Sequence, residues 1–242
     1  MSYDSEWIRY YDEIYSTKDY GSEVDYVLSF LEDIKNAHIL DIGCGTGNHS
    51  ILMSKEAYQV TGIDPSPHMI EIATQKGVFD NLSFKRGYVN DIFVRRYTLV
   101  VSLFNVINQI KTFYEVDEFF RQASIRTVFG GYFIFDCWNQ VATLLSKPLK
   151  KITCNDRMVF QCIPEVDEFN SKIILKNSIL NTETHKSIRY DIDINLWQPS
   201  ALRDILEKNG FEVEIYKTFT KEKASKEDYK IIFVNRKKNY VR

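Results

Sequence analysis

Apolar positions in the first half of the chain alternate between two spacings. Continuous or alternating apolar runs predict strands, because side chains on one face of a strand repeat every second residue. These runs cover residues 38–41, 58–63, 82–86 and 99–104. Apolar residues at helical spacing predict helices over residues 48–57, 66–76 and 115–128. We expect Ser66 and Pro67 to start the second helix, and Gly130-Gly131 to end the third.

The last part of the chain continues this alternation. It predicts a buried strand over residues 132–137, a helix over 199–208 that Asn209-Gly210 ends, and strands over 211–216 and 230–235. Strands that alternate with helices form parallel sheets with helices on both faces. We therefore predict an α/β fold, with a doubly wound, mostly parallel seven-stranded sheet that ends in a hairpin.

The stretch from residue 141 to residue 195 breaks the alternation. It contains three or four β-rich runs without a strong helix between them, and we interpret it as a small antiparallel sheet inserted after the fifth core strand. It emerges at the carboxyl edge of the core sheet, where ligands bind, so we expect it to cover an active site and to contact substrate. A purely structural insertion or a dimer surface is the alternative.

This pattern divides the chain into three parts. Residues 1–35 are expected to form an N-terminal helical lid, residues 36–140 and 196–242 the ligand-binding core, and residues 141–195 the inserted subdomain. No apolar run approaches the ~20 residues that a membrane helix requires, and no signal peptide is visible. We therefore expect a cytoplasmic protein without a membrane partner, and leave a homodimer open.

Charge and cysteine usage exclude several classes of function. The formal net charge of −2 gives no basic field for nucleic acid, and the Arg236-Lys237-Lys238 run is interpreted as a solvated end. The four cysteines form no C-x-x-C pair and the four histidines are scattered, so we expect no metal site. The cysteines are interpreted as free thiols in a reducing compartment.

The run His38-Ile-Leu-Asp-Ile-Gly-Cys-Gly-Thr-Gly47 carries the strongest chemical signal. Its three alternating glycines let backbone approach a ligand closely, because glycine has no Cβ and tolerates positive φ. A second carboxylate, Asp64, ends the next apolar run and is well placed to accept hydrogen bonds from two ribose hydroxyls. A glycine turn without a ligand would not explain carboxylates at two successive strand tips. The pattern therefore predicts a nucleoside ligand.

The glycine spacing indicates which nucleoside. Dinucleotide sites use G-x-G-x-x-G against a pyrophosphate, whereas this chain has Gly43-x-Gly45-x-Gly47 with Asp41 two residues earlier. A carboxylate there repels a pyrophosphate and favours an ammonium or a sulfonium group. An NAD-binding oxidoreductase is therefore disfavoured.

The glycine segment resembles motif I of the class I S-adenosylmethionine-dependent methyltransferases, and residues 62–69 resemble their second motif. The resemblance implies S-adenosylmethionine as cofactor. Asp41 would then lie near the methionine ammonium or hold the loop in shape, and Gly43 and Gly45 would allow close approach. Asp64 would bind the ribose, and Met69 would lie against the adenine unless it only packs in the core.

Near the adenine the chain departs from the family, which often has Gly-Asp where this chain has Gly87-Tyr88. Asp91, the Val89 backbone or a side chain elsewhere would have to replace the missing carboxylate. The other cofactor contacts that the resemblance implies are Tyr11, Cys44, Asn48, Pro65, Asn90 and Leu103.

The segment after the fourth strand, Ser102 to Gln109, lacks the N/D-P-P-Y motif of nucleic-acid amino-methyltransferases and indicates a small-molecule acceptor. Five tyrosines crowd the first twenty residues, where each offers an apolar ring and an orienting hydroxyl. Together with the segments 104–110 and 135–138, they resemble the TDP-amino-sugar N-methyltransferases. The alternative is that the tyrosines only pack an N-terminal helix against the core.

On this resemblance Tyr3 and Tyr20 would face the sugar amine, and Phe104, Asn105 and Trp138 would contact a TDP- or UDP-linked substrate. Family members carry a histidine near the accepting nitrogen where this chain has Gln109, a neutral group that can position the amine but cannot take its proton. The histidines that remain as candidates are His49, which is more readily interpreted as structural, and His185.

Other acceptors remain open at this point. The enzyme could methylate a hydroxyl or the amine of a free small metabolite instead of a nucleotide-linked sugar. A non-catalytic module that binds the cofactor and regulates a partner is a further alternative, because the adenine carboxylate and the histidine are both missing.

Overall fold

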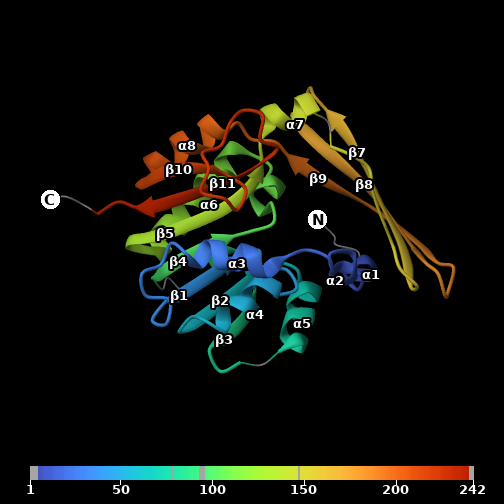
Figure 1. The fold of residues 1–242 in the computed structure, drawn as a ribbon, viewed down its shortest axis with the longest axis horizontal. Coiled ribbons are helices and arrows are strands. Elements are labelled where there is room, and N and C mark those ends of the chain that lie inside the picture. Colours follow the sequence, from blue (N-terminus) through green and yellow to red (C-terminus); the bar gives the residue numbers. More distant parts are fainter. Residues whose placement is uncertain (1–4, 78, 93–95, 147, 240–242) are drawn as a thin grey trace.

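A computed structural model describes residues 5–77, 79–92, 96–146 and 148–239. Its core is a seven-stranded sheet with the strand order β10-β11-β5-β4-β1-β2-β3 (Figure 1). The strands are β1 (His38–Ile42), β2 (Gln59–Asp64), β3 (Leu82–Arg86), β4 (Tyr97–Ser102), β5 (Thr127–Trp138), β10 (Phe211–Lys217) and β11 (Lys230–Lys237). Strand β11 runs antiparallel to both of its neighbours, and the other pairs are parallel. The predicted fold class, including the final hairpin, is confirmed.

Helices cover both faces of this sheet. Helices α6 (Phe113–Arg126) and α8 (Pro199–Lys208) pack on one face, and α3 (Tyr20–Leu28) and α4 (Asn48–Ser54) pack on the other. Helix α5 (Pro67–Lys76) contacts β2 and β3 and starts as predicted, with the Ser66 hydroxyl accepting a hydrogen bond from the Met69 N–H. In the described ranges, no helix combines the length and the apolar surface needed to cross a membrane.

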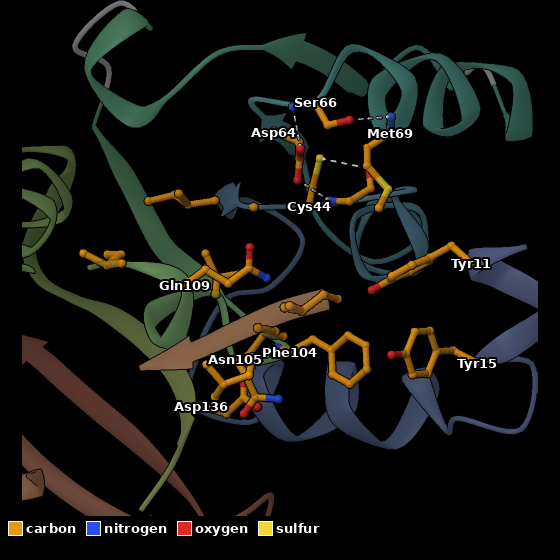
Figure 2. A pocket seen from close by; sticks show the side chains of 18 of the residues that line it. Tyr11, Tyr15, Cys44, Asp64, Ser66, Met69, Phe104, Asn105, Gln109 and Asp136 are labelled. Carbon is orange, nitrogen blue, oxygen red and sulfur yellow. Dashed lines mark hydrogen bonds between the residues drawn. The ribbon is translucent and has the colours of Figure 1, made fainter. Parts of the chain in front are cut away.

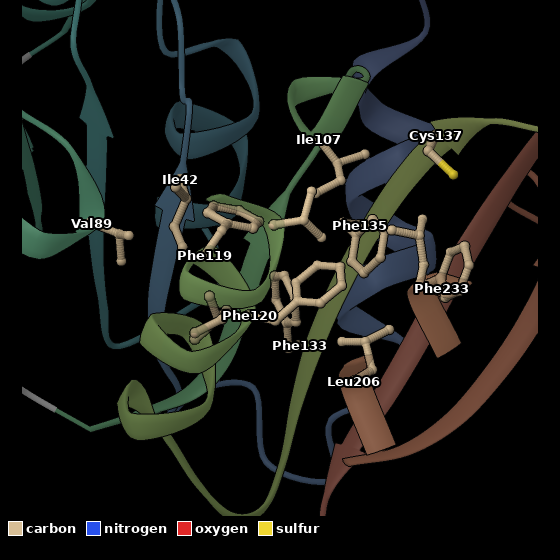
Figure 3. Close-up of a cluster of buried hydrophobic side chains, with 14 of the residues drawn as sticks. Ile42, Val89, Ile107, Phe119, Phe120, Phe133, Phe135, Cys137, Leu206 and Phe233 are labelled. Atoms are coloured by element: carbon tan, nitrogen blue, oxygen red, sulfur yellow. The ribbon is translucent and has the colours of Figure 1, made fainter. Parts of the chain in front are cut away.

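The core depends on the two-residue alternation of the central strands. Phe133 and Phe135 of β5 point to the face covered by α6, whereas Ile134 points to the opposite face. The Phe133 ring lies 5.9 Å from the Phe119 and Phe120 rings, centroid to centroid, and Phe135 stacks on Phe233 at 4.7 Å (Figure 3). This aromatic layer holds the parallel strands whose carboxyl ends form the site.

The predicted end of the third helix is wrong. Helix α6 stops at Arg126, because Thr127 adopts an extended conformation and its hydroxyl donates to the Ala123 carbonyl at 2.8 Å. Gly130 and Gly131 instead lie inside β5, where the register with β4 shifts. Gly130 has a φ of +76°, which glycine adopts without a steric penalty. The glycine pair therefore forms a bulge rather than a helix stop.

The chain between residues 141 and 195 forms a second, antiparallel sheet in the order β6-β7-β8-β9, as expected. The strands are β6 (Lys151–Cys154), β7 (Met158–Asp167), β8 (Lys172–Asn181) and β9 (Ser187–Asn195). Helix α7 (Gln140–Ser146), which apolar spacing did not predict, leads into it from β5. Figure 1 shows this sheet to one side of the core sheet.

The N-terminal segment lies between the two sheets. It contains the short helices α1 (Ser5–Ile8) and α2 (Tyr11–Ile14) before α3. Trp7 stacks on Tyr190 of β9, with ring centroids 4.5 Å apart, while Ile8 and Ile14 share a buried cluster with Met69 of α5. This segment therefore packs against the core and the inserted sheet together (Figure 1).

Two short 3-10 helices, η1 (Val89–Asp91) and η2 (Val106–Gln109), follow β3 and β4. The second one anchors the inserted sheet. The Asn108 side-chain amide donates to the Asn195 carbonyl at 2.7 Å, and the Trp197 indole donates to the Ile107 carbonyl at 3.0 Å. The end of β9 is thus fixed beside the loop that follows β4.

The aromatic layer generates a stability prediction. Phe133→Ala should lower the free energy of unfolding by about 3–5 kcal/mol, because it removes a fully buried ring and leaves a cavity. Phe169→Ala is the matched control, since that ring is 96% exposed, and it should change the value by less than about 0.5 kcal/mol. Urea unfolding of both variants measures the difference, and equal effects would contradict this account of the core.

Candidate active site

A cleft of about 1730 Å³ lies at the carboxyl ends of the parallel strands. Its walls come from the glycine loop after β1, the ends of β2 and β3, the loop after β4, the N-terminal segment and the inserted sheet. Figure 2 shows side chains from these elements converging on one space. Parallel α/β sheets bind their ligands at this edge, so the cleft is the candidate active site.

The glycine loop is fixed to the end of β2 by backbone hydrogen bonds. The N–H groups of Gly43 and Cys44 donate to the Ile63 carbonyl at 2.8 and 2.9 Å. Gly43, Gly45 and Gly47 all have positive φ. A Cβ on Gly47 would lie 2.6 Å from the Phe84 ring, whereas a Cβ on Gly45 would meet no atom within 4 Å. Gly45 therefore opens toward a ligand, while Gly47 permits close packing.

Asp64 lies at the tip of β2 and faces the cleft. Its carboxylate accepts the Gly45 N–H at 3.0 Å and the Ser66 N–H at 2.8 Å (Figure 2). Burial raises the pKa of this carboxyl, and the two backbone hydrogen bonds partly oppose that rise. Each carboxylate oxygen retains a lone pair that could accept a hydrogen bond from a ligand hydroxyl.

The structure places Asp41 behind the loop and not on the cleft wall. Its side chain is 1% exposed and accepts a hydrogen bond from the Ser50 hydroxyl of α4 at 2.6 Å. Burial raises the pKa of this carboxyl. Of the two expectations for Asp41, this position favours holding the loop and α4 in shape over direct contact with a ligand.

Apolar side chains line the neighbouring part of the cleft. Pro65, Met69 and Val89 lie on its wall together with Asn90. Met69 is 6% exposed and also belongs to the buried cluster beneath α1, so it both packs in the core and lines the cleft. Asp91 does not line the cleft, because its carboxylate turns back to accept the Tyr88 N–H at 2.8 Å.

Asp12 of α2 connects the N-terminal segment to the core. Its carboxylate accepts hydrogen bonds from the Thr46 hydroxyl at 2.7 Å and the Asn48 amide at 3.0 Å. It also forms an ion pair with Lys76 of α5 at 2.6 Å, and Lys76 donates to the side-chain Oδ1 of Asn48 at 2.8 Å. Since Tyr11 precedes Asp12, this network fixes the position from which the Tyr11 ring enters the cleft.

Aromatic rings form the wall opposite the glycine loop. Tyr11 of α2 and Tyr15 just after it point into the cleft, and Phe104 approaches from the loop after β4 (Figure 2). The Tyr15 ring lies 4.9 Å from both the Tyr11 and the Phe104 rings, and it is perpendicular to Phe104. Burial raises the pKa of the Tyr11 and Tyr15 hydroxyls, so both remain neutral at physiological pH.

A charged cluster lies beside these rings. Glu23 of α3 forms an ion pair with Lys18 and accepts a hydrogen bond from His49 Nε2 at 2.7 Å. The Tyr20 ring packs edge-on against the His49 ring at 4.9 Å. Burial opposes ionisation of Glu23, but the hydrogen bonds from His49 and Lys18 outweigh it and lower the pKa of this carboxyl.

The loop after β4 has an unusual backbone. Phe104 and Asn105 have φ values of +70° and +63°, which residues other than glycine rarely adopt. The buried Asp136 carboxylate accepts the N–H groups of both residues, at 2.6 and 3.2 Å, and so stabilises this conformation. Such backbone conformations are concentrated at functional sites. Here the conformation places Phe104 and Gln109 on the cleft wall.

The inserted sheet lines the cleft with its inner face. The side chains on that face are mostly apolar, and they include Phe160, Cys162, Leu175, Asn177, Ile192 and Ile194. On the outside, Lys176 forms ion pairs with Glu165 and Asp191 at 3.7 and 3.2 Å. The strand alternation therefore separates a ligand-facing surface from a solvated one.

Most of the residues proposed from the sequence line this cleft: Tyr11, Tyr20, Gly43, Cys44, Gly45, Asn48, Asp64, Pro65, Met69, Val89, Asn90, Leu103, Phe104, Asn105, Gln109 and Trp138. Tyr3 lies outside the described residues. Sequence reasoning did not select Tyr15, Lys18 or Glu23, and it set His49 aside as structural. The N-terminal tyrosine cluster was a signal for Tyr15, and Lys18 belongs to the Lys18-Asp19-Tyr20 run of the resembling pattern, but nothing in the sequence marked Glu23.

A family model described as a methyltransferase domain matches residues 13–215. Among curated proteins, YqeM of Bacillus subtilis, named as a methyltransferase, is 30% identical over 129 residues, which are 52% of this chain and 51% of YqeM. A dTDP-3-amino-3,4,6-trideoxy-alpha-D-glucopyranose N,N-dimethyltransferase of Streptomyces venezuelae is 24% identical over 50% of this chain and 52% of its own. The chain thus spans about half the length of these two relatives.

Solved structures share the fold over nearly the whole chain. The S-adenosylmethionine-bound structure of CalS10, an amino pentose methyltransferase from Micromonospora echinaspora, matches with a TM-score of 0.74 at 14% identity. The match covers 93% of this chain and 96% of that one.

Two glycines of the loop, Gly45 and Gly47, should respond differently to alanine. Gly47→Ala should lower the free energy of unfolding by about 2–4 kcal/mol, since it adds left-handed strain and a clash with Phe84. Gly45→Ala should cost only the strain of about 1–2 kcal/mol but weaken S-adenosylhomocysteine binding at least about tenfold, because the new methyl enters the cleft. Thermal unfolding and calorimetric titration measure the two effects. Unchanged S-adenosylhomocysteine affinity in folded Gly45→Ala would contradict the assignment of the glycine loop and Asp64 as the cofactor cradle.

Proposed function

The chain belongs to the methyltransferase family whose model matches residues 13–215, and its cofactor is S-adenosylmethionine. From this premise we propose that it methylates the amine of a nucleotide-linked amino sugar. When bound, the cofactor supplies a methyl group activated by a sulfonium, so the protein needs neither a metal nor a covalent intermediate. Its remaining tasks are to hold the acceptor, to align the nitrogen and to exclude water.

The residues of the cleft fit this cofactor. The open side of Gly45 leaves room for the cofactor to approach the backbone of the glycine loop. Asp64 offers carboxylate oxygens to the ribose hydroxyls. Met69, Val89 and Pro65 would enclose the adenine with apolar surface, and Asn90 or the Val89 backbone would contact its polar edge. Asn90 or the Val89 backbone would thereby take the place of the protein carboxylate that contacts adenine in the family. Asp91 cannot serve, because its side chain accepts the Tyr88 N–H within its own turn.

The N-terminal segment is proposed to act as a lid over the cofactor. Asp12 anchors it to the glycine loop and α5, and Tyr11 and Tyr15 extend from it into the cleft. A lid of aromatic rings excludes water from the reacting atoms and keeps the local dielectric low. The inserted sheet would close the remaining side.

The size of the cleft is the observation that carries the substrate proposal. At about 1730 Å³ it exceeds the roughly 300–1,000 Å³ of ordinary small-molecule sites, so it can hold the cofactor and a second ligand of nucleotide size. Lys111 and Lys151 on its wall provide ammonium groups for a diphosphate. The dTDP-amino-sugar dimethyltransferase relative and the CalS10 likeness support an amino sugar as the acceptor.

Tyr20 and Gln109 are proposed to orient the accepting nitrogen. Both lie on the cleft wall, and burial raises the pKa of the Tyr20 hydroxyl, which keeps it neutral. A neutral hydroxyl can accept a hydrogen bond from the amine and direct its lone pair at the methyl carbon. Tyr3 was assigned the same task from the sequence. Trp138 and Asn105 would contact the sugar.

Turnover of matched substrates tests the function. We expect S-adenosylhomocysteine release with a dTDP- or UDP-linked amino sugar, and none with the same nucleotide sugar carrying a hydroxyl in place of the amine. Mass spectrometry of the product identifies the methylated nitrogen. An enzyme that S-adenosylhomocysteine stabilises, but that methylates only free metabolites or hydroxyls, would contradict the nucleotide-linked acceptor. Absence of turnover with every acceptor would favour a regulatory binding module.

The Tyr20 hydroxyl should contribute to the rate. Tyr20→Phe is expected to lower kcat about tenfold with a smaller change in KM, because it removes one hydrogen bond that positions the nitrogen. Tyr58→Phe is the matched control, since that tyrosine is 60% exposed at the start of the β2 region and away from the cleft. Full turnover by Tyr20→Phe would refute its assigned role.

A further inference from the structure

Lys18 holds a position that is unusual for a lysine. Its side chain is only 13% exposed, although lysine is almost never buried without a partner. Its ammonium lies 4.6 Å from the centre of the Tyr20 ring and 4.9 Å from the centre of the Phe104 ring. Two aromatic faces around a cation are an arrangement that proteins use to recognise ammonium groups.

Glu23 completes the surroundings of this ammonium. One carboxylate oxygen pairs with Lys18, and the other accepts the hydrogen bond from His49 Nε2 at 2.7 Å. The Glu23 side chain is 16% exposed, so the pair is partly shielded from water. Because its pKa is lowered, Glu23 stays ionised at neutral pH and binds a cation rather than taking its proton.

The other carboxylates at the inner end of the cleft are engaged differently. Asp64 accepts the N–H groups of Gly45 and Ser66, and Asp136 accepts those of Phe104 and Asn105. Both therefore fix loops of the backbone. Glu23 is instead paired with the movable end of a long side chain, which a ligand can displace.

We propose that Lys18 occupies the subsite of the acceptor ammonium, and that the substrate nitrogen displaces it to bind Glu23 between the Tyr20 and Phe104 rings. This inference rests on the proposed function in one respect, namely that the acceptor is an amine. It makes Glu23 the residue that selects a primary or secondary ammonium over a hydroxyl when the acceptor binds. The exchange replaces one cation by another, so the buried carboxylate is never left unpaired. Methyl transfer needs the neutral amine, so the bound ammonium first releases one proton to solvent water, and the nitrogen lone pair then forms the new bond to the methyl carbon as the sulfonium leaves as a thioether.

The position of Lys18 in the chain suits this exchange. Lys18 precedes α3, whose N-cap residue Asp19 accepts the Ser22 N–H at 3.0 Å. The Lys18 backbone N–H is held by the Tyr15 carbonyl at 3.0 Å. The backbone can therefore remain in place while the flexible four-carbon side chain moves away from the rings.

Binding of a matched pair of small probes tests the subsite without the natural substrate. Cyclohexylamine and cyclohexanol have similar shape, but only the amine carries a positive charge at neutral pH. On wild-type protein saturated with S-adenosylhomocysteine, calorimetric titration should give a Kd for cyclohexylamine at least about tenfold below that for cyclohexanol. Equal affinities for the two probes would overturn the proposal, and this comparison needs no variant.

Variants then identify the groups responsible. Lys18→Met keeps the length of the side chain without its charge, and it should tighten cyclohexylamine binding about tenfold because the resident competitor is gone. Glu23→Gln should remove the preference for the amine. Lys35→Met is the matched control, since Lys35 pairs with Glu56 at 2.9 Å on the exposed surface. If Lys18→Met does not fold, Lys18→Gln serves the same test.

A structural ion pair would give the opposite result. In that case Lys18→Met and Lys18→Gln would lower the melting temperature and leave cyclohexylamine affinity unchanged or weaker, which would overturn the proposal. The outcome is independent of the nucleotide sugar. If the amine preference and its response to Lys18→Met hold while no nucleotide-linked amino sugar is methylated, the subsite stands and the substrate proposal fails. If a nucleotide-linked amino sugar is methylated but cyclohexylamine binds no better than cyclohexanol, the substrate proposal stands and the subsite proposal fails.

Discussion

The hydrogen bonds between the glycine loop and the tip of β2 are the constraint on which the rest of the site depends. Gly43 and Cys44 can both donate to the Ile63 carbonyl only because the loop turns through left-handed conformations. The same turn places the Gly45 N–H on Asp64. Loop, carboxylate and strand tip are therefore fixed together by the backbone, and the cradle exists before a ligand arrives.

The enclosure of the cleft follows from this fixed cradle. Asp12 binds Thr46 within the glycine loop and Asn48 directly after it, so the N-terminal segment is attached to the same rigid element that would hold the cofactor. From there the segment packs against the inserted sheet through Trp7 and Tyr190. The glycine loop thus fixes the position of the N-terminal segment, and through it that of the inserted sheet. The aromatic wall therefore faces the cofactor site in a defined geometry.

Local patterns were sufficient for much of the fold and for the cradle. The helix over residues 199–208 and the strand over 82–86 have the predicted bounds, because proline, Asn-Gly and alternation act within a few residues. Gly130-Gly131 was misassigned, since a bulge and a helix stop use the same glycines and only the pairing with β4 distinguishes them. The partners of Asp41, Asp91 and Glu23 depend on side-chain directions and on contacts between distant elements, which spacing does not encode.

The charged cluster gives an acceptor ammonium a binding partner that does not depend on the residue at position 109. A cleft that binds a sulfonium and an ammonium brings two positive charges together, and their repulsion is strong where water is excluded. Glu23, ionised and fixed by His49, offsets one of these charges at the acceptor end. Gln109 is then left with the task of positioning the nitrogen, because a carboxylate on α3 recognises the cation. Specificity for the acceptor is in this way set by α3 and the residues just before it, outside the loops that define the cofactor site.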